Sequence, residues 1–111
     1  MTMSNLATAL TAKNNSTLDA MQAAGARAQE VLGGPHPSQG LREEAAAIEH
    51  LEGQRDALAF ALEILRHGKP DNTIPAFLNR RLLEHITNGA ELEQIRGFAS
   101  VITDVLLTLG D

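Results

Sequence analysis

Apolar side chains recur along most of the chain at spacings of three and four residues, which is the period of a helix that buries one face. No stretch shows the alternation of β-branched and polar residues that is typical of strands. Breaker clusters at 33–40 and 67–72 and the pair Asn88-Gly89 separate the periodic stretches. The pattern therefore predicts an all-α fold, a small antiparallel bundle of four main helices.

The first main helix is expected over 17–32, because Ser16 can cap it and Asp19 stands where a capping box has its second partner. Its apolar stripe is thin and consists of Leu18, Met21, Gly25, Ala28 and Leu32.

The residues before this helix are expected to form a separate element. Met3, Leu6 and Leu10 share one helical face, which predicts an arm or a short extra helix over 1–15. Asn14-Asn15 argue against a helix that continues into the next element. We therefore divide the chain into this arm and a single helical-bundle domain over 16–111.

The second helix is expected over 41–66 and carries apolar residues on two sides. The first side is a heptad-like stripe that Arg55 interrupts: Ile48, Leu51, Leu58, Leu62 and Leu65. The second side consists of Ala46, Gly53, Ala57, Phe60 and Ile64. Two apolar sides imply two packing partners.

The third and fourth helices are expected over 74–87 and 90–109. The stripe of the fourth helix is Leu92, Ile95, Ala99, Ile102, Leu106 and Leu109, and a second side carries Phe98, Val101 and Val105. The predicted core of the bundle is Leu51, Leu58, Leu62, Leu78, Leu82, Ile95, Ile102 and Leu106.

Gly53 and Gly97 stand inside the second and fourth helices, where a glycine costs about 1 kcal/mol relative to alanine. We predict that both mark a close crossing of helix backbones. The apolar steps around them match at an offset of 44 residues, the separation of Gly53 from Gly97. Either a duplicated helical hairpin or the chance alignment of two amphipathic stripes explains this match.

The second and fourth helices offer more apolar surface than the thin first helix can cover. Left in water, that surface would exceed the few hundred Å² that are typical of monomers. We therefore expect a homo-oligomer, most simply a dimer. The expected interface with another copy or with a partner consists of Phe60, Ile64, Phe98, Val101 and Val105.

Composition narrows the classes of partner and compartment. The chain has 14 acidic and 9 basic residues and a net charge of -5, which disfavours nucleic acid and anionic membranes as partners. It has no cysteine, which excludes disulfides and thiolate chemistry. No apolar run approaches the roughly 20 residues that span a bilayer, and the first residues lack the pattern of a signal peptide. We expect a cytoplasmic protein with no membrane contact.

The sequence carries none of the standard catalytic motifs. No glutamate is followed by histidine at the Glu-x-x-His spacing of helical di-metal sites, and phosphate-binding and nucleophile-elbow motifs do not occur. Four histidines stand at separate places, where solvated or capping roles are commoner than metal ligation. The sequence therefore predicts no catalytic residue, no metal and no cofactor.

The candidate binding residues are cationic. At its stripe position Arg55 can reach past the core to solvent, pair with an acidic residue across an interface, or bind an anion. A basic concentration near the second breaker is either an anion-binding patch or ordinary surface pairing, since Arg80 and Glu84 stand at i, i+4. The candidate binding residues are Arg55, Arg66, Lys69, Arg80 and Arg81.

Two-sided apolar helices without catalytic chemistry favour a non-enzymatic interaction protein that occupies a surface of a protein partner. Adaptors and inhibitors have this character, including those that viruses or mobile elements encode. The alternative hypothesis is an oligomer that sequesters a small anionic ligand through Arg55 or the Arg80-Arg81 region. A nucleic-acid-binding regulator is a third hypothesis, which the charge disfavours.

Overall fold

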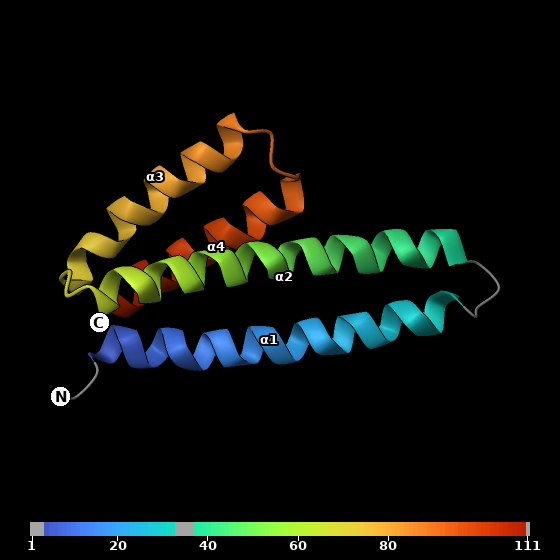
Figure 1. Ribbon diagram of the computed structural model, residues 1–111, viewed down its shortest axis with the longest axis horizontal. Coiled ribbons are helices and arrows are strands. Elements are labelled where there is room, and N and C mark those ends of the chain that lie inside the picture. The colour runs from blue at the N-terminus through green and yellow to red at the C-terminus, as the bar shows by residue number, and fades with distance from the viewer. Residues whose placement is uncertain (1–3, 33–36, 111) are drawn as a thin grey trace.

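The computed structural model describes residues 4–32 and 37–110, and this part of the chain forms an all-α bundle. Its elements are α1 (Asn5–Leu32), α2 (Pro37–Arg66), the short 3₁₀ turn η1 (Asp71–Thr73), α3 (Ile74–Thr87) and α4 (Leu92–Gly110). Each helix reverses the direction of the one before it (Figure 1). The expected antiparallel bundle of four main helices is confirmed.

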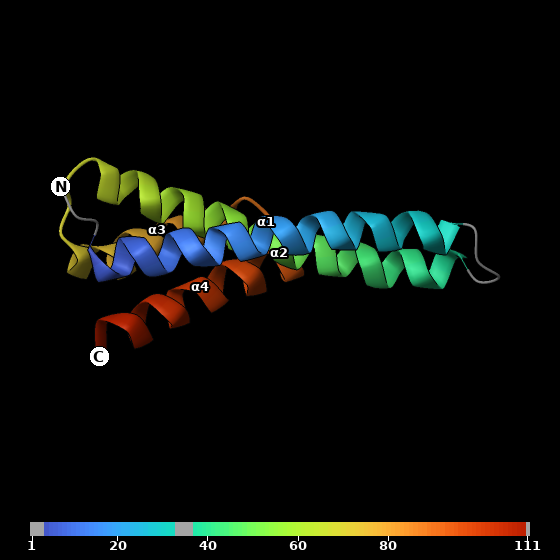
Figure 2. The same ribbon diagram turned by 90° about the horizontal axis from the view of Figure 1, so that it is seen from below.

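The hairpin that α1 and α2 form sets the longest dimension of the molecule (Figure 1). α1 and α2 pack along their lengths, while α4 crosses α2 and α3 lies against α2 and α4 (Figures 1 and 2). The far half of the α1 and α2 hairpin extends beyond α3 and α4 (Figure 2). The molecule therefore measures 51 × 32 × 23 Å.

α1 is one continuous helix, so the expected break at Asn14-Asn15 is wrong. The expected division into 1–15 and 16–111 falls inside this helix. Packing accounts for the continuity, because the helix buries one stripe at spacings of four, seven and seven residues. The stripe is Leu6, Leu10, Thr17 and Ala24. It lies one residue before the expected stripe, and Leu18 is 44% exposed.

α2 begins at Pro37, four residues before its expected start. Proline is favoured at the first helical position because its missing N–H would have no intrahelical partner there. Only residues 33–36 of the first breaker cluster, among them His36, lie outside the described residues.

The other two breakers end helices through glycine. After α3, Gly89 has a φ of 78°, its N–H donates to the Ile86 carbonyl at 3.1 Å, and the Ala90 N–H donates to the His85 carbonyl at 3.0 Å. This is a Schellman motif, which requires a left-handed residue at that point. The turn reverses the chain and sets α4 beside α3.

The core contains mainly aliphatic side chains from all four helices. Of the predicted core, Leu58, Leu78 and Ile102 are buried, and Leu62 and Leu82 pack against the buried cluster. Leu51 and Ile95 are half-buried, whereas Leu106 is 53% exposed, so its assignment to the core is wrong.

The predicted close crossing of backbones at Gly53 and Gly97 is confirmed. A Cβ on Gly53 would meet the Gln94 backbone, 2.8 Å from its carbonyl carbon, with the carbonyl oxygen closer still. A Cβ on Gly97 would meet the His50 backbone in the same way, 2.8 Å from its carbonyl carbon. Each glycine therefore faces the residue three positions before the other glycine, and the crossing is locally symmetric.

Candidate functional site

Five large apolar side chains of α3 and α4 are exposed to solvent, and one of them, Leu107, lies beside α1. Leu83 and Ile86 on α3 are 64% and 49% exposed, and Leu92 and Leu106 on α4 are 58% and 53% exposed. We call the surface of these four side chains the outer α3–α4 face. Half-buried Ile95 and Ala99 continue the α4 stripe between the two leucines.

Helical periodicity turns these four side chains away from α2. Arg81 lies over the Phe60 ring of α2, with its guanidinium carbon 5.1 Å from the ring centre, so that side of α3 faces α2. Ile86 lies about 140° and Leu83 about 160° around the helix from Arg81. On α4, Gly97 faces α2, and Leu106 points about 180° away from it. The outer face therefore lies along the α3 and α4 pair, on the side away from α2.

Three of the five expected interface residues lie instead inside the chain's own core, so their assignment to an interface is wrong. Phe98, Val101 and Val105 are at most 1% exposed, and Phe60 and Ile64 pack against the same buried cluster. The cause is the crossing: residues four and eight positions after Gly97 share its face, so Val101 and Val105 turn toward α2. Both apolar sides of α2 likewise find partners within the chain.

Sequence reasoning missed the outer face although a signal for it was present. The signal is Gly97, because a helix side that crosses another backbone closely cannot also carry an open stripe. Once the structure shows that Gly97 crosses α2, the stripe from Leu92 to Leu109 faces away from α2, and only Ile102 of that stripe is buried.

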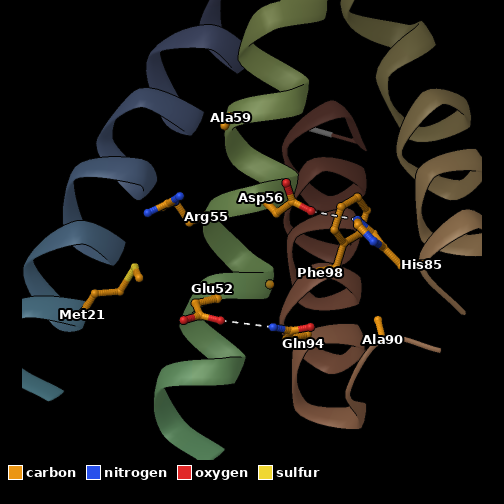
Figure 3. Close-up of a pocket in the computed structure, with 10 residues that line it drawn as sticks. Met21, Glu52, Arg55, Asp56, Ala59, His85, Ala90, Gln94 and Phe98 are labelled. Carbon is orange, nitrogen blue, oxygen red and sulfur yellow. Dashed lines mark hydrogen bonds and ion pairs between the residues drawn. The ribbon is translucent and has the colours of Figure 1, made fainter. Parts of the chain in front are cut away.

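A second candidate site is a hollow of about 310 Å³ between the helices (Figure 3). Its lining includes Met21 of α1, Glu52, Arg55, Asp56 and Ala59 of α2, His85 of α3, and Gln94 and Phe98 of α4. Its size is at the lower end of the range for small-molecule sites. Glu52 accepts a hydrogen bond from the Gln94 side-chain amide at 3.1 Å. Asp56 and His85 point toward each other, while Arg55 extends toward the α1 side (Figure 3).

The closest pair of chemical groups in the hollow is His85 Nε2 and Asp56 Oδ2, 2.7 Å apart. The contact is an ion pair when His85 is protonated and lacks the alignment of a hydrogen bond, since Nε2 has no hydrogen-bond partner. The His85 ring also packs edge-on against Phe98, with ring centres 5.2 Å apart. The lining has no hydroxyl or thiol group, so the pair has no nucleophile to activate.

The five candidate cations do not gather at one point of the surface. Arg66 pairs with Glu63 of its own helix at 2.7 Å, and Arg81 is held against Phe60. Lys69 is exposed in the turn after α2, and Arg80 is exposed on α3, where it lines a separate hollow of about 440 Å³ with Phe77. Arg55 lies eleven residues before Arg66, about 16 Å along α2.

Within residues 4–32 and 37–110, no three or more histidine, aspartate or glutamate side chains lie together as a metal site requires. No helix in the described part of the chain has the length and apolar character to cross a bilayer.

No protein family, curated protein or solved structure matches the chain.

Proposed function

We propose that this chain is a non-enzymatic helical interaction protein, of adaptor or inhibitor type, that covers a surface of a protein partner with its outer α3–α4 face. One observation carries the proposal: four large apolar side chains of two adjacent helices are about half or more exposed, on the helix sides that face away from α2. Exposed apolar surface of this kind is typical of protein interaction sites. Action in the cytoplasm, and association with another copy of the chain, belong to the same proposal.

The character of the face supports a helical or flat protein surface as its target. Leu92, Ile95, Ala99 and Leu106 follow one another at spacings of three, four and seven residues, and the buried Ile102 occupies the remaining step. Spacings of this kind occur in seams that pack against another helix. Most of the apolar stripe lies on a rigid helix that is pinned to α2 at Gly97, so binding requires little ordering of the site.

The charges that line the hollow beside Arg55 disfavour the alternative hypothesis, in which the chain binds a small anionic ligand. An anion there would meet the Glu52 and Asp56 carboxylates, which outnumber the single guanidinium. Repulsion by these carboxylates disfavours phosphate and carboxylate ligands alike. The outer face is also separate from the hollow, because none of its four exposed residues lines it.

The proposal is tested by quantitative capture of partners from an extract of the native host, followed by binding of the purified captured protein. Leu92→Glu with Leu106→Glu places two carboxylates on the outer face at sites that are already more than half exposed, so the fold is retained. We expect this double variant to lose binding by roughly a hundredfold, since apolar contacts are replaced by desolvated charges.

Leu107→Glu is the matched control. Leu107 is a leucine of the same helix, 66% exposed, and lies on a different side beside Ala9 and Lys13. It should bind as the unchanged chain does. Equal binding by the double variant and the unchanged chain would show that the outer face is not the binding surface.

A further inference from the structure

The turn between α3 and α4 contains the only asparagine of the chain that is followed by glycine, in the pair Asn88-Gly89. The other five asparagines are each followed by a residue that has a side chain. Glycine has no side chain, so its backbone nitrogen meets little steric hindrance when it approaches the side chain of the residue before it. Asn88 is therefore the asparagine whose side-chain amide is least protected from attack by the following backbone nitrogen.

This attack is a deamidation in two steps. The Gly89 nitrogen forms a bond to the carbonyl carbon of the Asn88 side chain and closes a cyclic imide. The side-chain nitrogen leaves as ammonia, which takes up the proton that the Gly89 nitrogen loses. Water then opens the imide at either of its carbonyl carbons, and both residues are exposed to water. One opening gives aspartate, and the other gives isoaspartate, in which the main chain runs through Cβ.

In the folded chain the turn holds the reacting atoms apart. Asn88 has a ψ of 3°, so the Gly89 nitrogen eclipses the Asn88 backbone nitrogen and is turned away from Cβ. Closure of the imide requires rotation about this bond. The rotation breaks the hydrogen bond that the Gly89 N–H donates to the Ile86 carbonyl at 3.1 Å, and the one from the Ala90 N–H to the His85 carbonyl at 3.0 Å. The reaction therefore requires the end of α3 to open.

Both products weaken the turn. Aspartate and isoaspartate each place a new negative charge at the C-terminal end of α3, where the helix dipole disfavours it. Isoaspartate also lengthens the main chain just before Gly89. The Schellman motif pairs N–H groups and carbonyls at fixed positions along the chain, so the longer main chain misaligns them.

We propose that Asn88 is a modification site, at which the chain deamidates itself to isoaspartate and aspartate, and that the turn between α3 and α4 controls the rate. The reactants are the chain's own Gly89 nitrogen and water. Loss of ammonia makes the change irreversible, and the change opens the turn that sets α4 beside α3. The inference does not depend on the proposed function, because it concerns the chain by itself.

Peptide mapping by mass spectrometry tests the site on the purified full chain in mildly alkaline buffer. Exchange of ammonia for water raises the mass of the modified peptide, and the peptide that contains Asn88 should be the first to change. The same incubation in guanidinium chloride removes the turn. It should accelerate the conversion of Asn88 at least about tenfold, since two backbone hydrogen bonds hold the folded turn closed.

Asn88→Gln is the matched control. Glutamine keeps an uncharged amide at this position, but its longer side chain would have to close a larger imide, so the peptide should stay unchanged over the same period. Hydrogen exchange then compares the aged chain with the fresh chain. The Gly89 and Ala90 amides should exchange at least about tenfold faster in the aged chain, because their hydrogen bonds to α3 are lost.

Three results would overturn the inference. Earlier conversion of a peptide with another asparagine would mean that Asn88 is not the preferred site. Equal rates in buffer and in guanidinium chloride would mean that the turn does not control the reaction. Equal exchange of the Gly89 and Ala90 amides in the aged and fresh chains would mean that the modification does not open the turn.

Discussion

Single residues decide how closely the two central helices approach. Gly53 and Gly97 remove the side chains that would hold α2 and α4 apart, and polar bridges form around the contact. The Gln54 side-chain amide donates to the Ser100 hydroxyl at 3.2 Å, and His50 Nδ1 lies 3.4 Å from a Glu93 carboxylate oxygen. These bridges occur because the absence of two Cβ atoms lets the backbones approach and brings the flanking side chains within reach.

The glycine crossing predicts that better helix formers destabilise the protein. Gly53→Ala and Gly97→Ala should each lower the free energy of unfolding by about 1 to 3 kcal/mol, because the new methyl group overlaps backbone that must move. Gly25→Ala is the control, since a Cβ there meets no atom within 4 Å. It should raise stability by up to about 1 kcal/mol through helix propensity. Urea denaturation measures all three, and a stabilising Gly97→Ala would contradict the crossing.

At the scale of elements, the sequence-based error in α1 has one cause. The break expected at Asn14-Asn15 separated Leu6 and Leu10 from the rest of the helix. Without these two anchors the apolar pattern predicts a stripe through Leu18 and not through its neighbour Thr17, which is 3% exposed. Asparagine is a weak helix former, but the cost of two such residues is smaller than the gain from burial of two leucines.

The register of α1 predicts unequal effects of two leucine substitutions. Leu10→Ala should destabilise the protein by about 2 to 5 kcal/mol, because Leu10 is 3% exposed and its loss leaves a cavity. Leu18→Ala should cost less than about 1 kcal/mol, since half-exposed side chains contribute less packing. Thermal denaturation followed by circular dichroism compares them. Equal losses would favour the interrupted helix.

The two sides of α4 predict opposite outcomes for adjacent residues. Val105→Ala removes buried methyl groups and should lower the free energy of unfolding by about 2 kcal/mol. Leu106→Ala should leave the stability of the isolated chain within about 0.5 kcal/mol. Both are measured by urea denaturation at a concentration where the chain is monomeric. A larger loss from Leu106→Ala would place the stripe in the core.

At the scale of the whole molecule, the shape departs from a compact domain. The Cα radius of gyration is 15.7 Å, whereas about 13 Å is usual for a chain of 111 residues. The excess comes from the far half of the α1 and α2 hairpin, which has no third helix beside it (Figure 2). A pair of helices buries only one side of each, so local stability should fall along the hairpin.

Hydrogen exchange tests this gradient. Amides of α2 over 42–48 should exchange at least about tenfold faster than those over 57–62, a difference of about 1.4 kcal/mol in local opening. The second segment includes the fully buried Ala57, Leu58 and Ala61. Uniform protection along α2 would instead mean that something covers the far hairpin in solution.

The sequence by itself determined the four helices, the glycine-terminated ends of α2 and α3, and the crossing residues Gly53 and Gly97. Each depends on local chemistry: an apolar period, a positive φ or a missing side chain. The sequence could not decide which apolar side of α4 is buried, because Val101 and Ile102 lie about 100° apart on stripes of similar hydrophobicity. Only tertiary structure decided this, since the gap at Gly53 on α2 accepts the Gly97 side and leaves Leu92 and Leu106 outside. The candidate site is thus a product of packing between distant residues.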